Sequence, residues 1–355
     1  MSKSSKTPPE CRILVLKLGA IGDVIHALPV VHSLKRAWPR ARITWIVEKA
    51  AYALLTHQPD VEEVLLFDKS RIRTLAGIFS YGQELRTELR RRRFDLALDL
   101  QGLFKSAALA WLSGAPQRLV YCNSREGSQW ISRQICGPHQ QGHVVEMLLD
   151  VVRYLGVAAE PVAFPLGILP ADQAALAQTA ADTGLNLLKP YVVLLLGANW
   201  PNKRWSVEAF AQVAEWLQQR GIQAVLAGGP AEQPLAAHWP ARFGLREAPM
   251  DLTGRTQLKE LAYLLSRARA CVGGDTGPMH LAAALGTPVV ALMGPTNPER
   301  NGPYGNGHQV LVTPRECAGC WRRQCPDGRD CLEAIHSTIV CGALEKILNG
   351  GSTHE

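Results

Sequence analysis

Two glycine-bearing turns carry the side chains best suited to chemistry. The first is Gly19-Ala20-Ile21-Gly22-Asp23, and the second is Gly274-Asp275-Thr276-Gly277-Pro278; each follows an apolar run. Pro278 suits the first turn of a helix, where its missing N–H would have had no partner. Free N–H groups at a helix start attract anions, and glycine lets a ligand approach the backbone. The second turn therefore predicts a phosphate site. The alternative is an ordinary strand–turn–helix in which Asp275 or Thr276 only caps the helix.

The first turn offers a candidate base, Asp23. The dipole at a helix N-terminus favours a charged carboxylate, and a general base must be ionised at neutral pH. The simpler interpretation is that Asp23 is the helix N-cap, and the two roles are compatible. The turn is neither a dinucleotide fingerprint nor a Walker loop, because it lacks G-x-G-x-x-G and no Gly-Lys-Ser/Thr follows it.

Three further loops place polar groups after apolar runs: Asp99–Ser106, Asn199–Ser206 and Gly228–Glu232. Gly102 permits a tight turn in the first loop, and the glutamate of the third suits a ribose diol. Taken singly, each reads as a solvated loop. Together they indicate a nucleotide-linked substrate.

These loops need a scaffold of short strands alternating with helices, which is typical of a parallel sheet covered on both faces. The expected strands are 11–18, 43–47, 64–67, 96–99, 118–120, 191–196, 224–227, 270–272 and 289–293. The expected helices are 24–38, 75–93, 106–112, 144–155, 207–220, 259–267, 278–285 and 335–348.

The fold class is therefore α/β, with two doubly wound, Rossmann-like domains. A linker-like stretch, Glu160–Pro165 and Pro170, separates them. We expect domains at 11–165 and 166–334, with a closing helix within 335–349. Ligands bind outside the carboxyl ends of such strands, so two facing domains would gather the polar loops around a central cleft.

Net charge is unevenly distributed along the 355 residues. The whole excess of +7 lies in residues 1–165, which hold 22 Lys/Arg against 15 Asp/Glu and peak at Arg90–Arg93. A basic half indicates an anionic partner such as a phosphorylated substrate, an acidic membrane surface or nucleic acid; a solvated helix end also explains Arg90–Arg93. The chain has no apolar run long enough to span a membrane and no signal-peptide layout, so we expect a cytoplasmic protein.

Four of the nine cysteines cluster as Cys317-x2-Cys320-x4-Cys325-x5-Cys331. This spacing suits a structural zinc site, or thiols packed in a loop, better than a redox site. We expect the other five cysteines to be buried or free.

Four segments in this order resemble the glycosyltransferase family 9 heptosyltransferases of lipopolysaccharide core assembly: Lys17–Val24, Asp99–Ala107, Lys203-Arg204-Trp205 and Gly274–Leu281. The resemblance covers nearly the whole chain, and Asp99–Ala107 is most similar to the type I enzymes (heptosyltransferase I). It implies a GT-B fold, and metal-free, cofactor-free, inverting transfer of L-glycero-D-manno-heptose. The implied donor is ADP-heptose, and the implied acceptor is the Kdo region of lipid A. The protein would bind this acceptor as a peripheral protein on the anionic cytoplasmic face of the inner membrane, and no nucleic-acid partner is implied.

The resemblance also implies roles for particular residues. Asp23 corresponds to the general base, Lys203 to the lysine that neutralises the diphosphate, and Glu232 to the acid that holds the ribose. The further implied donor-binding residues are Ala198, Asn199, Thr256, Asp275, Thr276, Gly277 and His280. The implied acceptor-binding residues are Lys17, Gln101, Gly102, Lys105 and Ser106. Ala198 and Asn199 stand where heptosyltransferase I has hydroxyl residues, and their backbone N–H groups can serve in place of those hydroxyls.

Three alternatives stay open. One is heptosyltransferase II, or a family 9 enzyme with a different donor or acceptor. Another is a UDP-sugar epimerase, which shares the two-domain architecture, and the third is a sugar-binding protein without catalysis.

Overall fold

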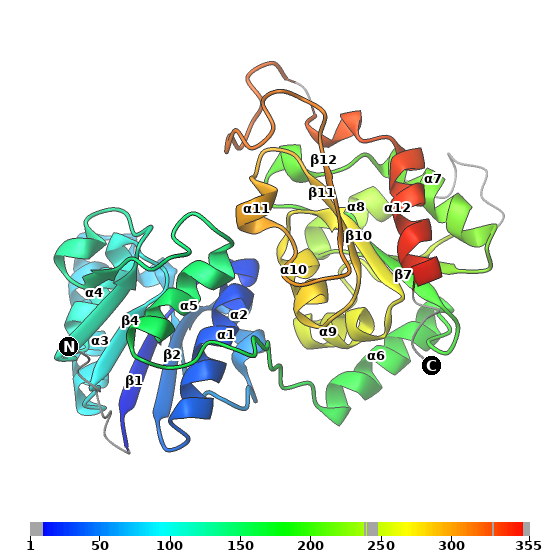
Figure 1. Ribbon diagram of the computed structural model, residues 1–355. Coiled ribbons are helices and arrows are strands. Elements are labelled where there is room, and N and C mark those ends of the chain that lie inside the picture. Colours follow the sequence, from blue (N-terminus) through cyan, green and yellow to red (C-terminus); the bar gives the residue numbers. More distant parts are fainter. Residues whose placement is uncertain (1–9, 238, 240–247, 329, 351–355) are drawn as a thin grey trace. The chain divides into compact units, whose positions relative to one another are not determined.

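The computed structural model describes residues 10–350 apart from 238, 240–247 and 329. The chain divides into two compact units, Met1–Gly167 and Ile168–Glu355. Among the described residues each unit contains one six-stranded, all-parallel sheet. Helices cover the sheets, as Figure 1 shows. The predicted α/β class with two Rossmann-like units is confirmed.

The N-terminal sheet has the strand order β3-β2-β1-β4-β5-β6. Its strands are β1 Arg12–Leu16, β2 Arg42–Glu48, β3 Glu63–Phe67, β4 Leu96–Asp99, β5 Gln117–Tyr121 and β6 Arg133–Ile135. Its helices are α1 Ile21–Ala37, α2 Lys49–Leu55, α3 Leu75–Arg91, α4 Phe104–Leu112 and α5 Val144–Tyr154. The central strands are aliphatic and almost wholly buried, as strands covered on both faces must be.

The C-terminal sheet repeats this topology with the order β12-β11-β10-β7-β8-β9. Its strands are β7 Tyr191–Leu195, β8 Gln223–Ala227, β9 Met250–Asp251, β10 Ala270–Gly274, β11 Val289–Met293 and β12 Gln309–Val312. Its helices are α6 Pro170–Thr183, α7 Val207–Gln218, α8 Gln233–Ala237, α9 Leu258–Arg267, α10 Gly277–Ala284, α11 Pro298–Asn301 and α12 Ser337–Gly350.

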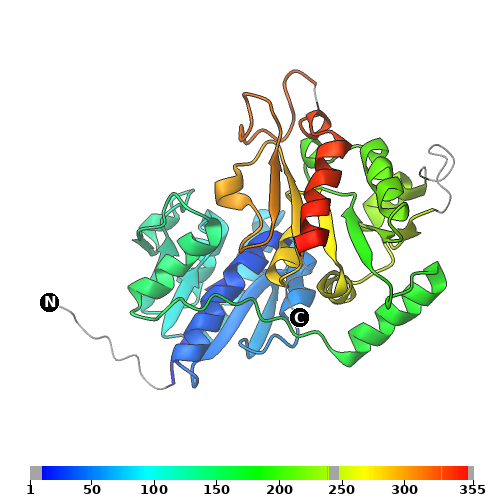
Figure 2. The ribbon, with the colours of Figure 1, turned by 45° about the vertical axis from the view of Figure 1, so that its right-hand side comes forward.

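One apolar core of the C-terminal unit lies between its sheet and the pair α7 and α12. Trp205 anchors it: the indole packs edge-on against Phe210, with 4.9 Å between ring centroids, and donates to the carbonyl of Ile335 at 3.0 Å. Figure 2 shows α12 lying across this sheet. The expected closing helix thus belongs to the core of the C-terminal unit.

Both sheets reverse their strand order at one place, between β1 and β4 and between β7 and β10. In doubly wound sheets ligands bind beside the carboxyl ends of the strands at such a switch point. Candidate sites are therefore expected where β1 and β4 end, and where β7 and β10 end.

Several predictions about elements were wrong. Pro170 was assigned to the linker, yet it is the first residue of α6, a position that suits proline. Helix α1 begins at Ile21 with Ala20 as N-cap, so Asp23 lies within the first turn and is not the cap. The prediction missed seven elements: α2, α6, α8, α11, β6, β9 and β12. Most of these are short, so their apolar pattern gives little signal.

The cysteines outside the cluster are not all free. Cys11, Cys271 and Cys341 are buried thiols, as expected, but Cys122 and Cys136 form a disulfide. This corrects the prediction, which had no way to pair residues that meet only when β6 is placed beside β5. No helix in the described part of the chain is both long enough and apolar enough to cross a membrane.

Candidate active site

Asp23 sits at the switch point of the N-terminal unit. One of its carboxylate oxygens, Oδ2, accepts from the backbone N–H of Ala20 at 3.2 Å, and Oδ1 lies 3.9 Å from Nζ of Lys17. The side chain is 41% exposed, so solvent can reach it. The turn therefore presents a carboxylate that has a cation on one side and is open on the other.

Lys17 is buried under this turn. Its ammonium donates to the carbonyl of Leu100 at 2.8 Å, because Leu16 pairs with Asp99 in the register of β1 and β4. Asp99 is fully buried, and burial raises its pKa to about 6, even though the N–H of Gly102 and the charge of Lys17 favour the ionised form. The charge of Lys17 thus acts on one buried and one exposed carboxyl group.

The loop after β4 holds the loop after β1 in place. Oε1 of Gln101 accepts from the N–H of Leu18 at 3.0 Å. Gly102 has φ +67°, and a Cβ there would lie 2.8 Å from the ring of Tyr121, so the tight turn needs glycine. The fold thus brings Lys17, Asp23 and Gln101 together as one group. Gly102 forms the tight turn that follows Gln101.

Lys105 and Ser106 lie in the first turn of α4, which begins two residues earlier than predicted. Nζ of Lys105 lies 2.7 Å from Oε1 of Glu48, whose other oxygen is 3.2 Å from Lys69. Burial raises the pKa of Glu48, but the two lysines outweigh it and lower the pKa overall. The hydroxyl of Ser106 bonds to the backbone of Leu103 at the start of the helix, and it also hydrogen-bonds Asp99. Of the expected acceptor-binding cations, Lys105 is the accessible one.

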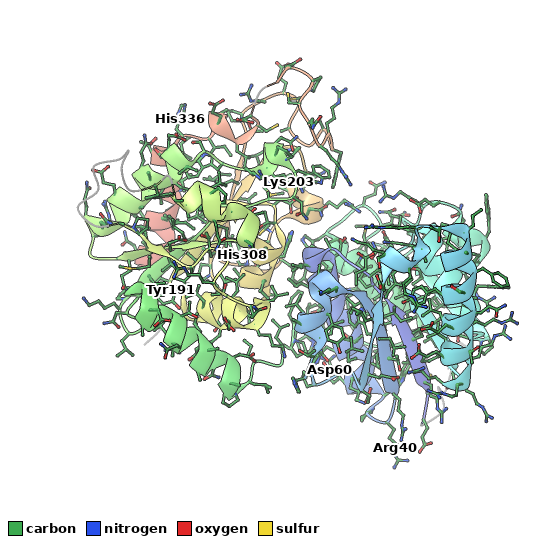
Figure 3. The ribbon with its side chains drawn as sticks, turned by 180° about the vertical axis from the view of Figure 1, so that it is seen from behind. Arg40, Asp60, Tyr191, Lys203, His308 and His336 are labelled. Atoms are coloured by element: carbon green, nitrogen blue, oxygen red, sulfur yellow. A yellow bond between two sulfur atoms is a disulfide. The ribbon has the colours of Figure 1, made fainter. Side chains whose placement is uncertain are left out.

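Lys203 and Asp275 meet at the switch point of the C-terminal unit. Nζ of Lys203, in the turn after β7, donates to Oδ2 of Asp275, after β10, at 2.6 Å; Figure 3 labels Lys203. Gly274 makes this approach possible, because a Cβ there would stand 2.2 Å from the carbonyl oxygen of Lys203. The close approach predicted for this glycine is therefore to the protein's own backbone.

Asp275 receives two more side-chain hydrogen bonds. Nε2 of His280 lies 2.9 Å from its Oδ1, and the hydroxyl of Thr296 donates to its Oδ2 at 2.7 Å. Burial by itself would raise the pKa of Asp275, but His280 and Lys203 hold it well below its usual range. Asp275 is thus a buried, ionised carboxylate whose hydrogen bonds orient Lys203, His280 and Thr296.

Thr276 occupies the N-cap position of α10, yet its hydroxyl makes no capping bond. Its Oγ1 is buried without a hydrogen-bond partner. Since Gly277 and Pro278 follow it as the first helical residues, free N–H groups and an unpartnered hydroxyl lie together at the helix start. Capping alone does not account for these residues, and the group suits an anion.

Glu232 lies against glycines from two strand ends. A Cβ on Gly197 would stand 2.4 Å from the carboxyl carbon of Glu232, and one on Gly228 would stand 2.8 Å from its Cβ. Oε2 also accepts from the N–H of Gly229 at 2.8 Å. The carboxylate is therefore held beside the loop that leads to Lys203.

The remaining donor candidates contribute less. Ala198 offers its carbonyl to Nε of Arg204 at 2.9 Å, and Asn199 is exposed. Thr256 is half-buried ahead of α9, in the loop where Gly254 donates to the carbonyl of Gly228. These positions lie on neighbouring strand-end loops.

The four clustered cysteines lie on a loop between β12 and α12 and are not disulfide-bonded. Burial raises the pKa of Cys331, and the other three thiols add to the rise. In the part of the chain that the structure describes, no three His, Cys, Asp or Glu side chains are placed to hold a metal ion. Cys331 is buried, Cys325 is half-buried, and Cys317 and Cys320 are exposed.

Sequence reasoning missed Thr296 and Trp200. Thr296 follows the strand at 289–293 in Gly294-Pro295-Thr296, so its place after a strand end was a usable signal. Trp200 lies three residues before Lys203, and Nζ of Lys203 stands 4.3 Å from its ring centroid.

Two Rossmann-like units, each with charged side chains gathered at its switch point, define a GT-B-like two-domain α/β fold of the kind seen in sugar transferases. The sequence pattern of glycosyltransferase family 9 (heptosyltransferase) matches residues 83–329. The chain belongs to this glycosyltransferase family.

Named relatives and solved structures agree with this membership. A lipopolysaccharide heptosyltransferase 1 of Pseudomonas aeruginosa is 33% identical over 325 residues, covering 88% of this chain and 87% of the relative. The lipopolysaccharide core heptosyltransferase OpsX of Haemophilus influenzae is 29% identical over 310 residues, covering 86% and 85%. The Escherichia coli heptosyltransferase WaaC with ADP-2-deoxy-2-fluoro heptose is 25% identical, with a TM-score of 0.72 over 94% of this chain and 99% of that one.

Proposed function

We propose that this protein transfers L-glycero-D-manno-heptose from ADP-heptose to the Kdo region of lipid A, with inversion at the anomeric carbon. Family membership supports transfer over epimerisation or simple sugar binding. The Escherichia coli enzyme solved with an ADP-heptose analogue supports the donor.

Asp23 carries the proposal as the general base. Its carboxylate is exposed, is held by the N–H of Ala20, and has the Lys17 ammonium on one side. In the proposed step an acceptor hydroxyl attacks C1 of the heptose while Asp23 takes its proton. The bond from C1 to the phosphate oxygen breaks on the opposite face, so a single displacement inverts the centre.

The C-terminal unit would stabilise the leaving ADP. As the bond breaks, the electron pair passes to a phosphate oxygen, and fixed positive groups lower the energy of that charge. Lys203, the start of α10 and the hydroxyl of Thr276 would supply them without a metal ion. Glu232, beside Gly197, would hold the ribose hydroxyls.

The acceptor would meet the N-terminal unit at an anionic membrane surface on the cytoplasmic side. This unit carries the whole excess of +7. At the start of α3, Leu75, Ile78 and Phe79 are 86, 50 and 70% exposed, and they follow the basic segment Lys69–Arg73. Apolar side chains beside cations suit peripheral binding to anionic lipid.

Lys105 would bind the acceptor's anionic groups. Behind it, the turn that carries Asp23 would be shaped by Lys17, Gln101, Gly102 and Ser106.

Acceptor-dependent ADP release tests the proposal. The purified protein is incubated with ADP-heptose and Kdo-lipid A, and in parallel with an acceptor that already carries one heptose. Release with the first acceptor supports the proposal, and release with only the second assigns the type II reaction. UDP-sugar turnover without any acceptor would refute transfer.

A further inference from the structure

Two cations lie over the indole ring of Trp200. Nζ of Lys203 stands 4.3 Å from the ring centroid and Cζ of Arg323 stands 5.5 Å from it. Cations within about 6 Å of an indole face are attracted by its quadrupole. The ring therefore holds near the donor site a second cation that lies 120 residues further along the chain.

Arg323 reaches this position because the loop between β12 and α12 folds back onto the strand ends. The N–H of Gly319 donates to the carbonyl of Gly294 at 2.9 Å, and that of Trp321 donates to Pro295 at 2.7 Å. The buried side chain of Asn202, next to Lys203, donates to the carbonyl of Arg322 at 2.6 Å. These three hydrogen bonds thus fix the loop immediately before Arg323. In Figure 1 this loop extends beyond the ends of β11 and β12.

The two cations differ in how their charge is balanced. Lys203 is paired with the ionised Asp275 at 2.6 Å. Among the described residues, no carboxylate lies within ion-pair distance of Arg323, whose guanidinium lies over the ring of Trp200. The pair of cations at this ring therefore carries one unopposed positive charge, which an anion would balance.

We propose that Arg323 is a second cationic residue for the diphosphate of the donor, acting beside Lys203. This inference rests on the proposed function. Because Asp275 already offsets the charge of Lys203, Arg323 supplies the positive charge that a doubly anionic diphosphate still needs. The same guanidinium stabilises the charge that develops on the leaving nucleoside diphosphate when the bond to C1 breaks.

Equilibrium binding to the full-length protein tests this role. The ligands are ADP, UDP, GDP and adenosine, and the variants are Arg323→Gln and Arg323→Lys. Arg220→Gln is the matched control, since the guanidinium of Arg220 stands 3.9 Å from the ring centroid of Trp216, on α7. We expect Arg323→Gln to weaken ADP binding about tenfold, the lower range for a hydrogen bond to a charged group. Adenosine binding should not change, Arg323→Lys should recover part of the loss, and Arg220→Gln should bind ADP like wild type.

Any other result of these binding measurements contradicts either the role of Arg323 or the proposed donor. ADP binding that is unchanged in Arg323→Gln, or equal losses for ADP and adenosine, refute the role of Arg323 in holding the diphosphate. If the wild type prefers UDP or GDP, the proposed donor is wrong, and the comparison of Arg323 variants is made with that nucleotide. A wild type that binds none of the three refutes both proposals.

Discussion

Nζ of Lys203 and Oδ2 of Asp275 are 2.6 Å apart, and this contact joins the ends of β7 and β10, the two strands at the switch point of the C-terminal sheet. The lysine is held in one place before any ligand arrives, so little side-chain entropy remains to be lost on binding. The same pairing offsets its charge, which gives Arg323 its proposed importance.

The first prediction concerns Asp23. Asp23→Asn keeps an acceptor for the N–H of Ala20 but cannot take a proton, so turnover should fall by ~10²–10⁴-fold. Steady-state ADP release measures this, and ADP binding should remain at the wild-type level. Asp182→Asn, an exposed carboxylate on α6, is the control. Near-wild-type turnover of Asp23→Asn with intact folding would refute the assignment of the base.

The second prediction uses the pKa of Asp99, which burial raises from 3.8 to about 6. Between these values the folded protein binds this proton more tightly than the unfolded chain. The free energy of unfolding from this group therefore falls as pH rises from about 4 to 6, by at most about 3 kcal/mol. Denaturant titrations at several pH values should show that Asp99→Asn removes this slope. An unchanged slope would contradict the raised pKa.

The third prediction concerns Thr296, one of the residues that sequence reasoning missed. Thr296→Val removes a buried hydrogen bond to the ionised Asp275 and should lower the free energy of unfolding by about 1.5–3 kcal/mol. It should also weaken ADP binding, because Asp275 orients Lys203. Thr296→Ser keeps the hydroxyl and should behave like wild type in both measurements. If serine fails to rescue, the hydrogen bond is not the cause.

The fourth prediction concerns Gly274. Gly274→Ala places a methyl group 2.2 Å from the carbonyl oxygen of Lys203, a backbone atom that cannot simply rotate away. We expect a loss of about 1–3 kcal/mol in stability, as for overpacking, together with weaker ADP binding. Gly342→Ala is the matched control: this glycine is in α12 with open space around its Cβ position, so alanine should stabilise the helix slightly. A stable, ADP-binding Gly274→Ala protein would show that β10 and the Lys203 turn can separate.

The fifth prediction tests the membrane surface at the start of α3. The double change Leu75→Ser and Phe79→Ser should weaken binding to vesicles containing anionic lipid by about tenfold or more, since burying each side chain contributes roughly 1.5–3 kcal/mol. Leu188→Ser is the control, because Leu188 is 95% exposed in the C-terminal unit. Cosedimentation with anionic and neutral vesicles measures the effect. Equal binding of the double variant and wild type would place the contact elsewhere.

The sequence by itself determined the α/β class, the alternation of strands and helices, and the strand-end loops that carry polar residues. These follow from local patterns, because the apolar period of each segment decides its structure and the loop after a parallel strand must open at one edge of the sheet. The turns at Asp23 and Asp275 were found this way. Short elements such as β6 and β9 were missed because two or three residues carry no measurable period.

Only the tertiary structure decided which of those loops meet. The strand order places β1 beside β4 and β7 beside β10, so Gln101 binds the loop of Leu18, and Lys203 binds Asp275. It also decided that Thr296 completes the set around Asp275 and that Arg323 returns to the ring of Trp200. Contacts between residues 21 to 123 positions apart depend on how the sheet is assembled and how a loop folds back over it. No local pattern in the chain encodes that order.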